Sequence, residues 1–390
     1  MSCRQDSGAG RRVLHTVRSV SALYIHIPFC VSRCAYCAFY STTRLDCAER
    51  YVAACRREMS LRRDVAGSGV TTVYIGGGTP SVLPVPLIEQ LLEGIDMTCA
   101  VEVTVECNPD DVTASLAGAL GRMGVNRVSV GVQTFDDTTL RRMGRRHDAA
   151  DAVRAVDTLR AAGIANISID LMYGFPGETV AQWERDVSAA VRLGVEHVSA
   201  YLLSYEEGTP LYSLRESGRV TETDEETCAR MYYVMTDMLA DAGYEHYEIS
   251  NFARQGFRSR HNSAYWTGVP YAGIGAAAHS YDGACRAWNI ADLDSYMNSI
   301  ERGVLPAERE TLDIHTQYND MMMLALRTTE GVSLRALAAR FGDGYRDYCL
   351  RCARTYLDGG LLHVTADGCL RLTRRGLFVS DMVMADLMIV

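Results

Sequence analysis

The sequence predicts an α/β fold: an open, three-quarter (βα)6 barrel of the TIM-like kind, followed by a winged-helix-like α+β domain. Two observations lead to this prediction. Short β-branched runs alternate with longer helical patterns from about residue 23 to residue 203, and the pattern changes character after about residue 311. Repeated βα units require a parallel sheet with right-handed crossovers, and six units are too few to close a barrel of eight.

The βα units are visible one after another along the chain. Strands are expected at residues 23–27, 71–75, 101–106, 126–131, 166–171 and 197–203, and helices at 46–63, 86–95, 113–123, 148–162 and 179–193. Asp46 and Thr113 can cap helix starts, and Gly124, Gly163 and Gly194 follow helix ends. Barrels of this kind bind ligands at the carboxyl ends of their strands, so we expect the functional site there.

The rest of the chain has a different organisation. We expect a loop at 206–212, a helix at 224–242, a strand at 244–252 and an irregular loop at 254–289. Helical patterns at 314–326, 333–341 and 345–358 and a hairpin of 361–364 with 369–372 predict a winged helix. Its basic excess is slight, which favours a packing role over DNA binding. The predicted domains are a disordered extension (1–21), the barrel (22–245), an irregular connecting segment (246–310) and the winged-helix-like domain (311–390).

Composition excludes several functional classes. Of 390 residues, 48% are hydrophobic, which excludes wholesale disorder, and the net charge of −9 argues against a nucleic-acid partner. All 39 basic residues are Arg, so neither a Lys Schiff base nor a P-loop lysine is available. Thirteen cysteines and no secretory segment favour a reducing, cytoplasmic location, and Asp6 favours a disordered extension over a transit peptide.

The strongest local signal is the spacing Cys30-x3-Cys34-x2-Cys37 in the loop after the first strand. Soft thiolates at this spacing select an iron–sulfur cluster or zinc. A structural zinc site would need a fourth ligand nearby, whereas the residue two positions after Cys37 is Phe39. Three thiolates on a 4Fe–4S cluster leave one iron open, and buried structural cysteines are the remaining alternative.

The phrase Tyr24-Ile-His-Ile-Pro-Phe-Cys30, together with the three cysteines, resembles the radical S-adenosylmethionine (SAM) superfamily. The resemblance implies that the open iron chelates the amino and carboxylate groups of SAM. It also implies that the reduced cluster splits SAM to a 5′-deoxyadenosyl radical and that Tyr36 lies against the adenine.

Polar phrases end four of the predicted strands: 76–80 (GGGTP), 106–110 (ECNPD), 131–135 (GVQTF) and 170–177 (DLMYGFPG). Parallel strands bring these phrases to one rim. Together they resemble the oxygen-independent coproporphyrinogen III oxidases and their relatives, from about residue 23 to residue 287 and weakly through the tail. The resemblance implies a SAM-contacting set of Tyr24, Gly77, Gly78, Thr79, Glu106, Gln133, Arg145 and Asp170. Carboxylates and the Gln133 amide can accept from ribose hydroxyls, and Arg145 can donate to a carboxylate.

The chain departs from the oxidases at Phe39, where they usually carry a fourth Cys, and in lacking their long segment before the first strand. Residues 261–266 (HNSAYW) resemble instead the HNxxYW phrase of heme chaperones of the HemW type. The resemblance implies that His261, Tyr265 and Trp266 contact heme. Neighbouring Arg258 and Arg260 could pair with the propionates, and His279 is a weaker candidate ligand.

We therefore expect a chaperone that binds a 4Fe–4S cluster, SAM and heme, and that passes heme to an acceptor hemoprotein such as a membrane-associated respiratory enzyme. A homodimer is left open. The alternative is an enzyme: a coproporphyrinogen III oxidase (dehydrogenase) that decarboxylates propionates in porphyrin biosynthesis by radical chemistry. No metal role is expected for Cys349 and Cys352, and 321–323 (MMM) is expected to pack in a core.

Overall fold

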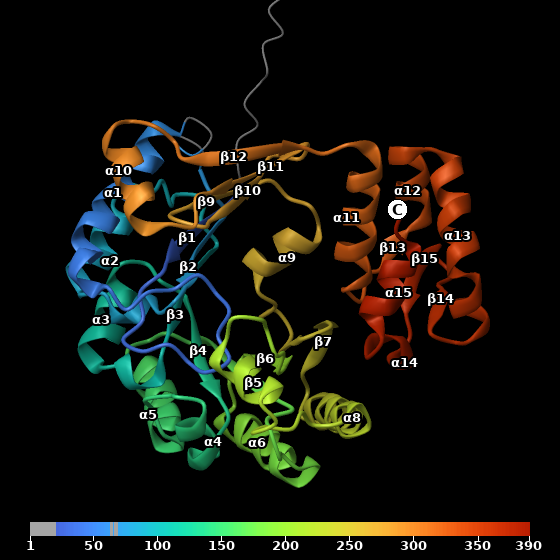
Figure 1. Ribbon diagram of the computed structural model, residues 1–390, viewed down its shortest axis with the longest axis horizontal. Helices are drawn as coiled ribbons and strands as arrows, with labels where there is room; N and C mark the ends of the chain where they lie inside the picture. The colour runs from blue at the N-terminus through green and yellow to red at the C-terminus, as the bar shows by residue number, and fades with distance from the viewer. Residues whose placement is uncertain (1–20, 63–64, 66–68) are drawn as a thin grey trace, which may run out of the picture.

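The structure is a computed structural model and describes residues 21–62, 65 and 69–390. The disordered extension expected at 1–21 lies outside the described residues, except for Ser21. Figure 1 shows a curved sheet flanked by helices on one side and a compact C-terminal part on the other, with the short helix α9 between them.

Six parallel strands form the centre of the sheet and confirm the open (βα)6 barrel. They neighbour one another in chain order, each strand pairing with the next. These strands are β1 (Ala22–Ile27), β2 (Thr72–Gly77), β3 (Glu102–Cys107), β4 (Arg127–Gln133), β5 (Asn166–Tyr173) and β6 (His197–Leu202).

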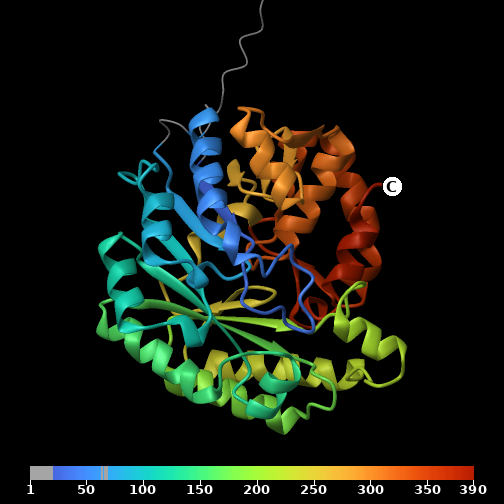
Figure 2. The ribbon, with the colours of Figure 1, turned by 60° about the vertical axis from the view of Figure 1, so that its left-hand side comes forward.

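Helices follow the strands and cover the outer face of the sheet (Figure 2). They are α1 (Ala48–Leu61), α2 (Val85–Leu92), α3 (Ala114–Arg122), α4 (Asp137–Arg142), α5 (Ala149–Ala161) and α6 (Val180–Leu193), with short 3-10 turns at Leu45–Cys47, Pro80–Val82 and Pro109–Asp111. Thr113 caps α3, and Gly194 ends α6 with φ +64°. The predicted cap at Asp46 is wrong: Asp46 lies in a 3-10 turn, and α1 begins after Cys47 without a side-chain cap.

The two faces of the barrel strands differ in polarity because successive side chains point to opposite faces. In β4, Val128, Val130 and Val132 are fully buried and belong to the main hydrophobic core. The alternate residues Arg127 and Ser129 point into the barrel, and both are also buried. The barrel interior is therefore a place where buried polar groups must find partners inside the fold.

The segment at 254–289, predicted to be irregular, contains regular structure. It holds α9 (Arg260–Trp266), β9 (Tyr271–Ile274), β10 (His279–Tyr281) and β11 (Cys285–Asn289), followed by α10 (Leu293–Glu301) and β12 (Ala307–Thr311). β9 pairs with the free edge of β1, and β10–β12 extend the sheet antiparallel. These strands are too short to be recognised by their own pattern, and the edge of a distant strand supplies their pairing.

At the other edge, the single strand predicted at 244–252 is a hairpin of β7 (Glu245–Glu248) and β8 (Asn251–Ala253). The loop predicted at 206–212 gives way to α7 (Pro210–Glu216), which Thr209 caps and Pro210 starts, and α8 (Glu225–Asp241) follows. Proline at a first helical position is compatible with a helix start. No helix in the described ranges is long and apolar enough to cross a bilayer.

The C-terminal residues form a second core with a winged-helix arrangement. The elements are α11 (Ile314–Leu326), β13 (Val332–Ser333), α12 (Leu334–Phe341), α13 (Asp343–Asp358), β14 (Leu362–Val364), β15 (Cys369–Leu372), α14 (Arg374–Leu377) and α15 (Ser380–Leu387). The three strands form their own antiparallel sheet. Met322 and Cys349 are fully buried in this core, whose members do not include the barrel strands.

Candidate functional site

The three cysteines lie on one loop that leaves the carboxyl end of β1. Its backbone is fixed by hydrogen bonds from Cys30 N–H to Thr42 O (2.9 Å) and from Ala35 N–H to Met143 O (3.0 Å). All three thiols are unpaired and partly exposed. The loop therefore presents three thiols from a short, well-held segment.

The surroundings of the thiols fit a 4Fe–4S cluster. Burial raises the pKa of Cys30 and of Cys37, so both thiols lose protons when they bind a metal. The Arg145 guanidinium donates to Cys34 Sγ at 3.5 Å, and the Thr79 hydroxyl is 3.4 Å from Cys30 Sγ. Among the described residues, no three His, Cys, Asp or Glu side chains lie close enough together to hold a single metal ion.

The glycine phrase after β2 packs directly against the cysteine loop. Gly78 N–H donates to Ile27 O (2.8 Å), and Thr79 N–H donates to Phe29 O (2.8 Å). Gly77 has φ +114°, and a Cβ at this position would lie 2.4 Å from the His26 ring. Only glycine tolerates both this positive φ and this close approach to the His26 ring. The glycines therefore let the chain pack against the cysteine loop and bring Thr79 beside Cys30.

Glu106 joins the ends of β2 and β3. Its carboxylate accepts from Tyr74 Oη (2.7 Å) and from Gly77 N–H (2.9 Å). Burial, reinforced by the negative charge of Asp170, raises the pKa of Glu106 to about 7. A carboxylate held in this way at the rim can still accept from a ligand hydroxyl, because each oxygen has two lone pairs.

Arg145, Gln133 and Asp170 complete the rim. Arg145 donates to Asn108 Oδ1 (2.9 Å) and to Gly131 O, and Ser129 donates to Asp170 at 3.2 Å. Gln133 adopts a left-handed conformation, φ +69°, at an irregularity between β4 and β5. Such conformations persist where the surroundings enforce them, frequently at ligand sites.

Apart from Tyr24, the structure brings the predicted SAM set to the carboxyl ends of β2–β5. Tyr24 lies in the middle of β1, with its Oη 2.9 Å from His26 Nδ1. Tyr36 is partly buried close to Arg145. Sequence reasoning missed Tyr74 and Asn108, which hold Glu106 and Arg145. The inward register of Tyr74 on β2 and the position of Asn108 directly after β3 were the available signals.

Arg127 was also missed. It is 1% exposed inside the barrel, and its Nε and Nη1 have no hydrogen-bond partner among the described residues. Burial raises the pKa of Glu106 and of Asp170, and the positive charge of Arg127 opposes that rise. The same charge adds to the lowering of the pKa of His261 that burial causes.

The HNxxYW phrase forms α9, and its histidine points into the barrel. His261 is 1% exposed; its Nδ1 is 2.9 Å from Thr72 Oγ1 and its Nε2 is 2.8 Å from Tyr265 Oη. Burial lowers the pKa of His261 to about 3. Both ring nitrogens are engaged inside the fold, so the geometry differs from the expected heme ligand and makes His261 an anchor of α9.

A large cavity lies between the barrel and the C-terminal core. Its volume is about 1,790 Å³; Tyr265 and Trp266 line it, and it extends to Tyr24 and Phe39 beside the cysteine loop. Phe39 is 72% exposed. The opposite wall comes from α11 and α12, including Met321 and Met323. The expected packing role therefore applies to Met322 and to Met321, which packs against the C-terminal core and also lines the cavity. Met323 is exposed and faces the cavity.

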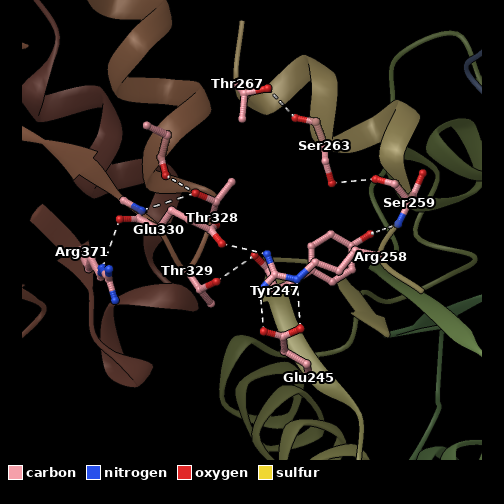
Figure 3. A network of polar contacts seen from close by, with 12 residues as sticks. Glu245, Tyr247, Arg258, Ser259, Ser263, Thr267, Thr328, Thr329, Glu330 and Arg371 are labelled. Atoms are coloured by element: carbon pink, nitrogen blue, oxygen red, sulfur yellow. Dashed lines mark hydrogen bonds and ion pairs between the residues drawn. The ribbon is translucent and has the colours of Figure 1, made fainter. Parts of the chain in front are cut away.

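A polar network at one side of the cavity joins α9, β7 and the C-terminal core (Figure 3). Arg258 forms ion pairs with Glu245 and with Glu330, the latter at 2.8 Å. Thr329 N–H donates to Tyr247 O at 3.1 Å. Arg258, expected to meet a propionate, is thus already paired, and Arg260 is exposed and does not line the cavity.

Comparison with known proteins identifies the families that the chain resembles. Residues 24–190 match the Radical SAM superfamily, and residues 312–379 match the HemN C-terminal domain. A Bacillus subtilis protein named Heme chaperone HemW is 35% identical over 93% of this chain and 98% of its own length. The chain belongs to the HemW family of radical SAM proteins. A HemW relative from Mycobacterium tuberculosis is 34% identical over 94% of both chains.

The family also has a structural neighbour among enzymes. The coproporphyrinogen III oxidase of Escherichia coli, described as a radical SAM enzyme, superposes with a TM-score of 0.83 over 96% of this chain and 91% of its own. The two sequences are 21% identical, so this likeness establishes the fold alone. A radical SAM fold implies a 4Fe–4S cluster and SAM, which the three thiols and the polar rim are suited to hold.

Proposed function

We propose that this protein is a heme chaperone that binds heme in the cavity between the barrel and the C-terminal core and delivers it to an acceptor hemoprotein. The observation that carries the proposal is the cavity itself. Its walls offer the flat faces of Tyr265, Trp266, Tyr271 and Trp288. Aromatic faces suit a planar, largely apolar macrocycle. The names of the HemW relatives support the same assignment.

Phe39 favours the chaperone over the oxidase. It stands where the oxidases usually carry a fourth Cys, and it lines the cavity with a largely exposed ring. An exposed aromatic ring beside the cysteine loop contributes to a hydrophobic surface for cargo.

For the cofactors, we propose Cys30, Cys34 and Cys37 as cluster ligands and the Glu106, Gln133, Arg145 and Asp170 rim as the SAM site. When bound, a reduced cluster supplies an electron that can cleave SAM. The protein's own part is to orient SAM and to shield it from water. Arg145 adds positive charge beside Cys34, while Glu106 and Asp170 supply acceptors for the hydroxyls of SAM.

The acceptor, the location and the assembly state are further parts of the proposal. We expect a cytoplasmic protein whose acceptor is a hemoprotein such as a membrane-associated respiratory enzyme, and a homodimer is the assembly to test first. Size-exclusion chromatography with and without reconstituted cluster and SAM would test the dimer.

The central test is a hemin titration of the full chain with its cluster reconstituted anaerobically. Saturable binding, followed by transfer of the heme to an added apo-hemoprotein, is expected. In parallel, the protein is incubated with coproporphyrinogen III, SAM and a reductant under nitrogen. Accumulation of protoporphyrinogen without hemin binding would refute the chaperone function and show that the protein is a coproporphyrinogen III oxidase.

A further inference from the structure

We infer that His279, and not the histidine of the HNxxYW phrase, is the protein ligand of the heme iron in this cavity. The inference rests on the proposed heme-binding function and names the residue that would carry it. His279 begins β10, which lies in the antiparallel extension of the sheet and forms one wall of the cavity.

The histidines near the cavity differ in what their ring nitrogens contact. His26 is 6% exposed, with Nδ1 2.9 Å from Tyr24 Oη and Nε2 3.0 Å from Tyr40 O. His261 is similarly engaged by Thr72 and Tyr265. His279 is exposed, and across the described ranges neither of its ring nitrogens has a hydrogen-bond partner. It is therefore the histidine on the cavity wall with a nitrogen free to bind iron.

The backbone holds His279 in place toward the cavity. Ala277, two residues earlier, has φ +61°, a conformation that is unusual for a residue with a Cβ. Ala277 N–H donates to Ile290 O at 3.1 Å, and Asn289 N–H donates to Ala278 O at 3.0 Å. These bonds tie the turn before β10 to the end of β11, so the strained turn is enforced by its neighbours.

The chemistry around His279 suits an iron ligand and a macrocycle. The Trp288 ring stacks beside the imidazole, with centroids 6.2 Å apart and planes 29° from parallel. Partial burial of the ring, together with the positive charge of Arg286, lowers the pKa of His279, which keeps the imidazole neutral as a metal ligand must be. Arg286 is itself held by Asp320 of α11. A proximal histidine holds the heme iron in globins and peroxidases.

The test compares hemin binding by the full, cluster-reconstituted chain with that of His279→Ala. Hemin is titrated by difference absorbance, and the ligand is identified by electron paramagnetic resonance and resonance Raman spectra. We expect the affinity to fall about tenfold or more, since even the outer-shell partners of metal ligands are worth about 10- to 100-fold. The histidine-ligand signature should disappear from the spectra and return on addition of free imidazole.

Two further variants make the result specific. His363→Ala removes an exposed histidine on β14 outside the cavity and should bind hemin as the wild type does. His279→Met keeps a ligand of different field strength, so it should shift the spectra even if His279→Ala folds poorly. If the wild type binds hemin and His279→Ala retains the histidine signature, the inference is overturned while the proposed function stands. If the wild type does not bind hemin, the proposed function fails, and the inference fails with it.

Discussion

Glu106 stabilises a tight turn and also places a carboxylate at the rim of the barrel. It accepts from Gly77 N–H and from Tyr74 Oη, and its pKa is raised to about 7. Below that pH the folded protein holds Glu106 mostly protonated, and a protonated carboxyl offers less acceptor capacity to a ribose hydroxyl. Burial has therefore brought the titration of this group into the physiological range.

We expect SAM to bind the cluster-loaded protein more weakly at about pH 6 than at about pH 8, because protonation of Glu106 removes an acceptor. Glu106→Gln should lower the affinity at the higher pH about tenfold, as the loss of a hydrogen bond to a charged group implies. It should also flatten the pH profile measured by calorimetry. Glu89→Gln, an exposed change on α2, should leave the wild-type profile intact, and a flat wild-type profile would contradict this role of Glu106.

The cysteine loop makes an equally specific prediction about metal content. Reconstituted protein should carry about four irons per chain, and Cys34→Ser should lose most of them, because thiolates hold such clusters. Cys99→Ser, which changes an exposed free cysteine, should keep the full iron content and the brown colour. Zinc in place of iron in anaerobically prepared wild type would refute the cluster.

Residues differ in how far the sequence reveals them. The three cysteines lie within eight positions of one another, so their spacing alone predicts a shared site. The surroundings of His261 depend on Thr72, 189 positions earlier, and on the way α9 enters the barrel. No local pattern contains that contact, so the phrase indicated the family without showing what its histidine touches.

Helices and strands also divide into those that a local sequence pattern predicts and those that depend on distant contacts. The parallel strands are long and apolar enough to be predicted within a few residues. β9–β11 depend on the edge of β1 for pairing and were not predicted, although β9–β10 carry the wall on which His279 lies. The glycine turn after β2 was predicted as a ligand contact, and the structure adds its role in packing against β1.

Gly77→Ala should destabilise the barrel by at least about 1–3 kcal/mol, since it forces a Cβ into a left-handed conformation. Contact with the His26 ring adds to that cost. Urea unfolding measures the difference. Gly94→Ala is the matched control, because nothing lies within 4 Å of a Cβ at that position. Equal stability of the two variants would show that the turn can relax.

The packing of α9 against the barrel should depend on the buried His261. Glu102 accepts from the N–H groups of Arg260 and His261, and His261 links Thr72 to Tyr265. His261→Ala should leave buried hydroxyls without partners, at a cost of about 1–3 kcal/mol. Thermal unfolding should show this loss of stability. The spectra of bound hemin should keep the histidine-ligand signature, because His279 is unchanged. His363→Ala, at an exposed position on β14, should unfold as the wild type does.

At the scale of the whole molecule, Arg327 connects the C-terminal core to the barrel. Its guanidinium lies 4.9 Å from the Trp266 ring centre and 3.9 Å from the buried Glu248 carboxylate. Burial raises the pKa of Glu248, and Arg327 opposes that rise. A raised pKa means that the unfolded chain releases this proton more readily, so Glu248 costs stability as the pH rises above its ordinary range.

Arg327→Met should therefore lower the free energy of unfolding by about 1–2 kcal/mol near neutral pH, where Glu248 loses its counter-charge. The loss should be smaller at about pH 5, where the carboxyl stays protonated in the fold. Urea midpoints at the two pH values measure this difference. Arg375→Met, on the exposed side of α14, is the control. A loss that is independent of pH would assign the effect to the Trp266 contact alone.

The walls of the cavity come from two parts of the fold, each beside its own buried core: Tyr265 and Trp266 lie on α9, whereas Met321 and Met323 lie on α11. The width of the cavity is therefore set by the contact between the barrel and the C-terminal core, and not by the packing inside either of them. A small rotation of the C-terminal core away from the barrel would open a route into the cavity for a bulky ligand without unfolding any helix or strand.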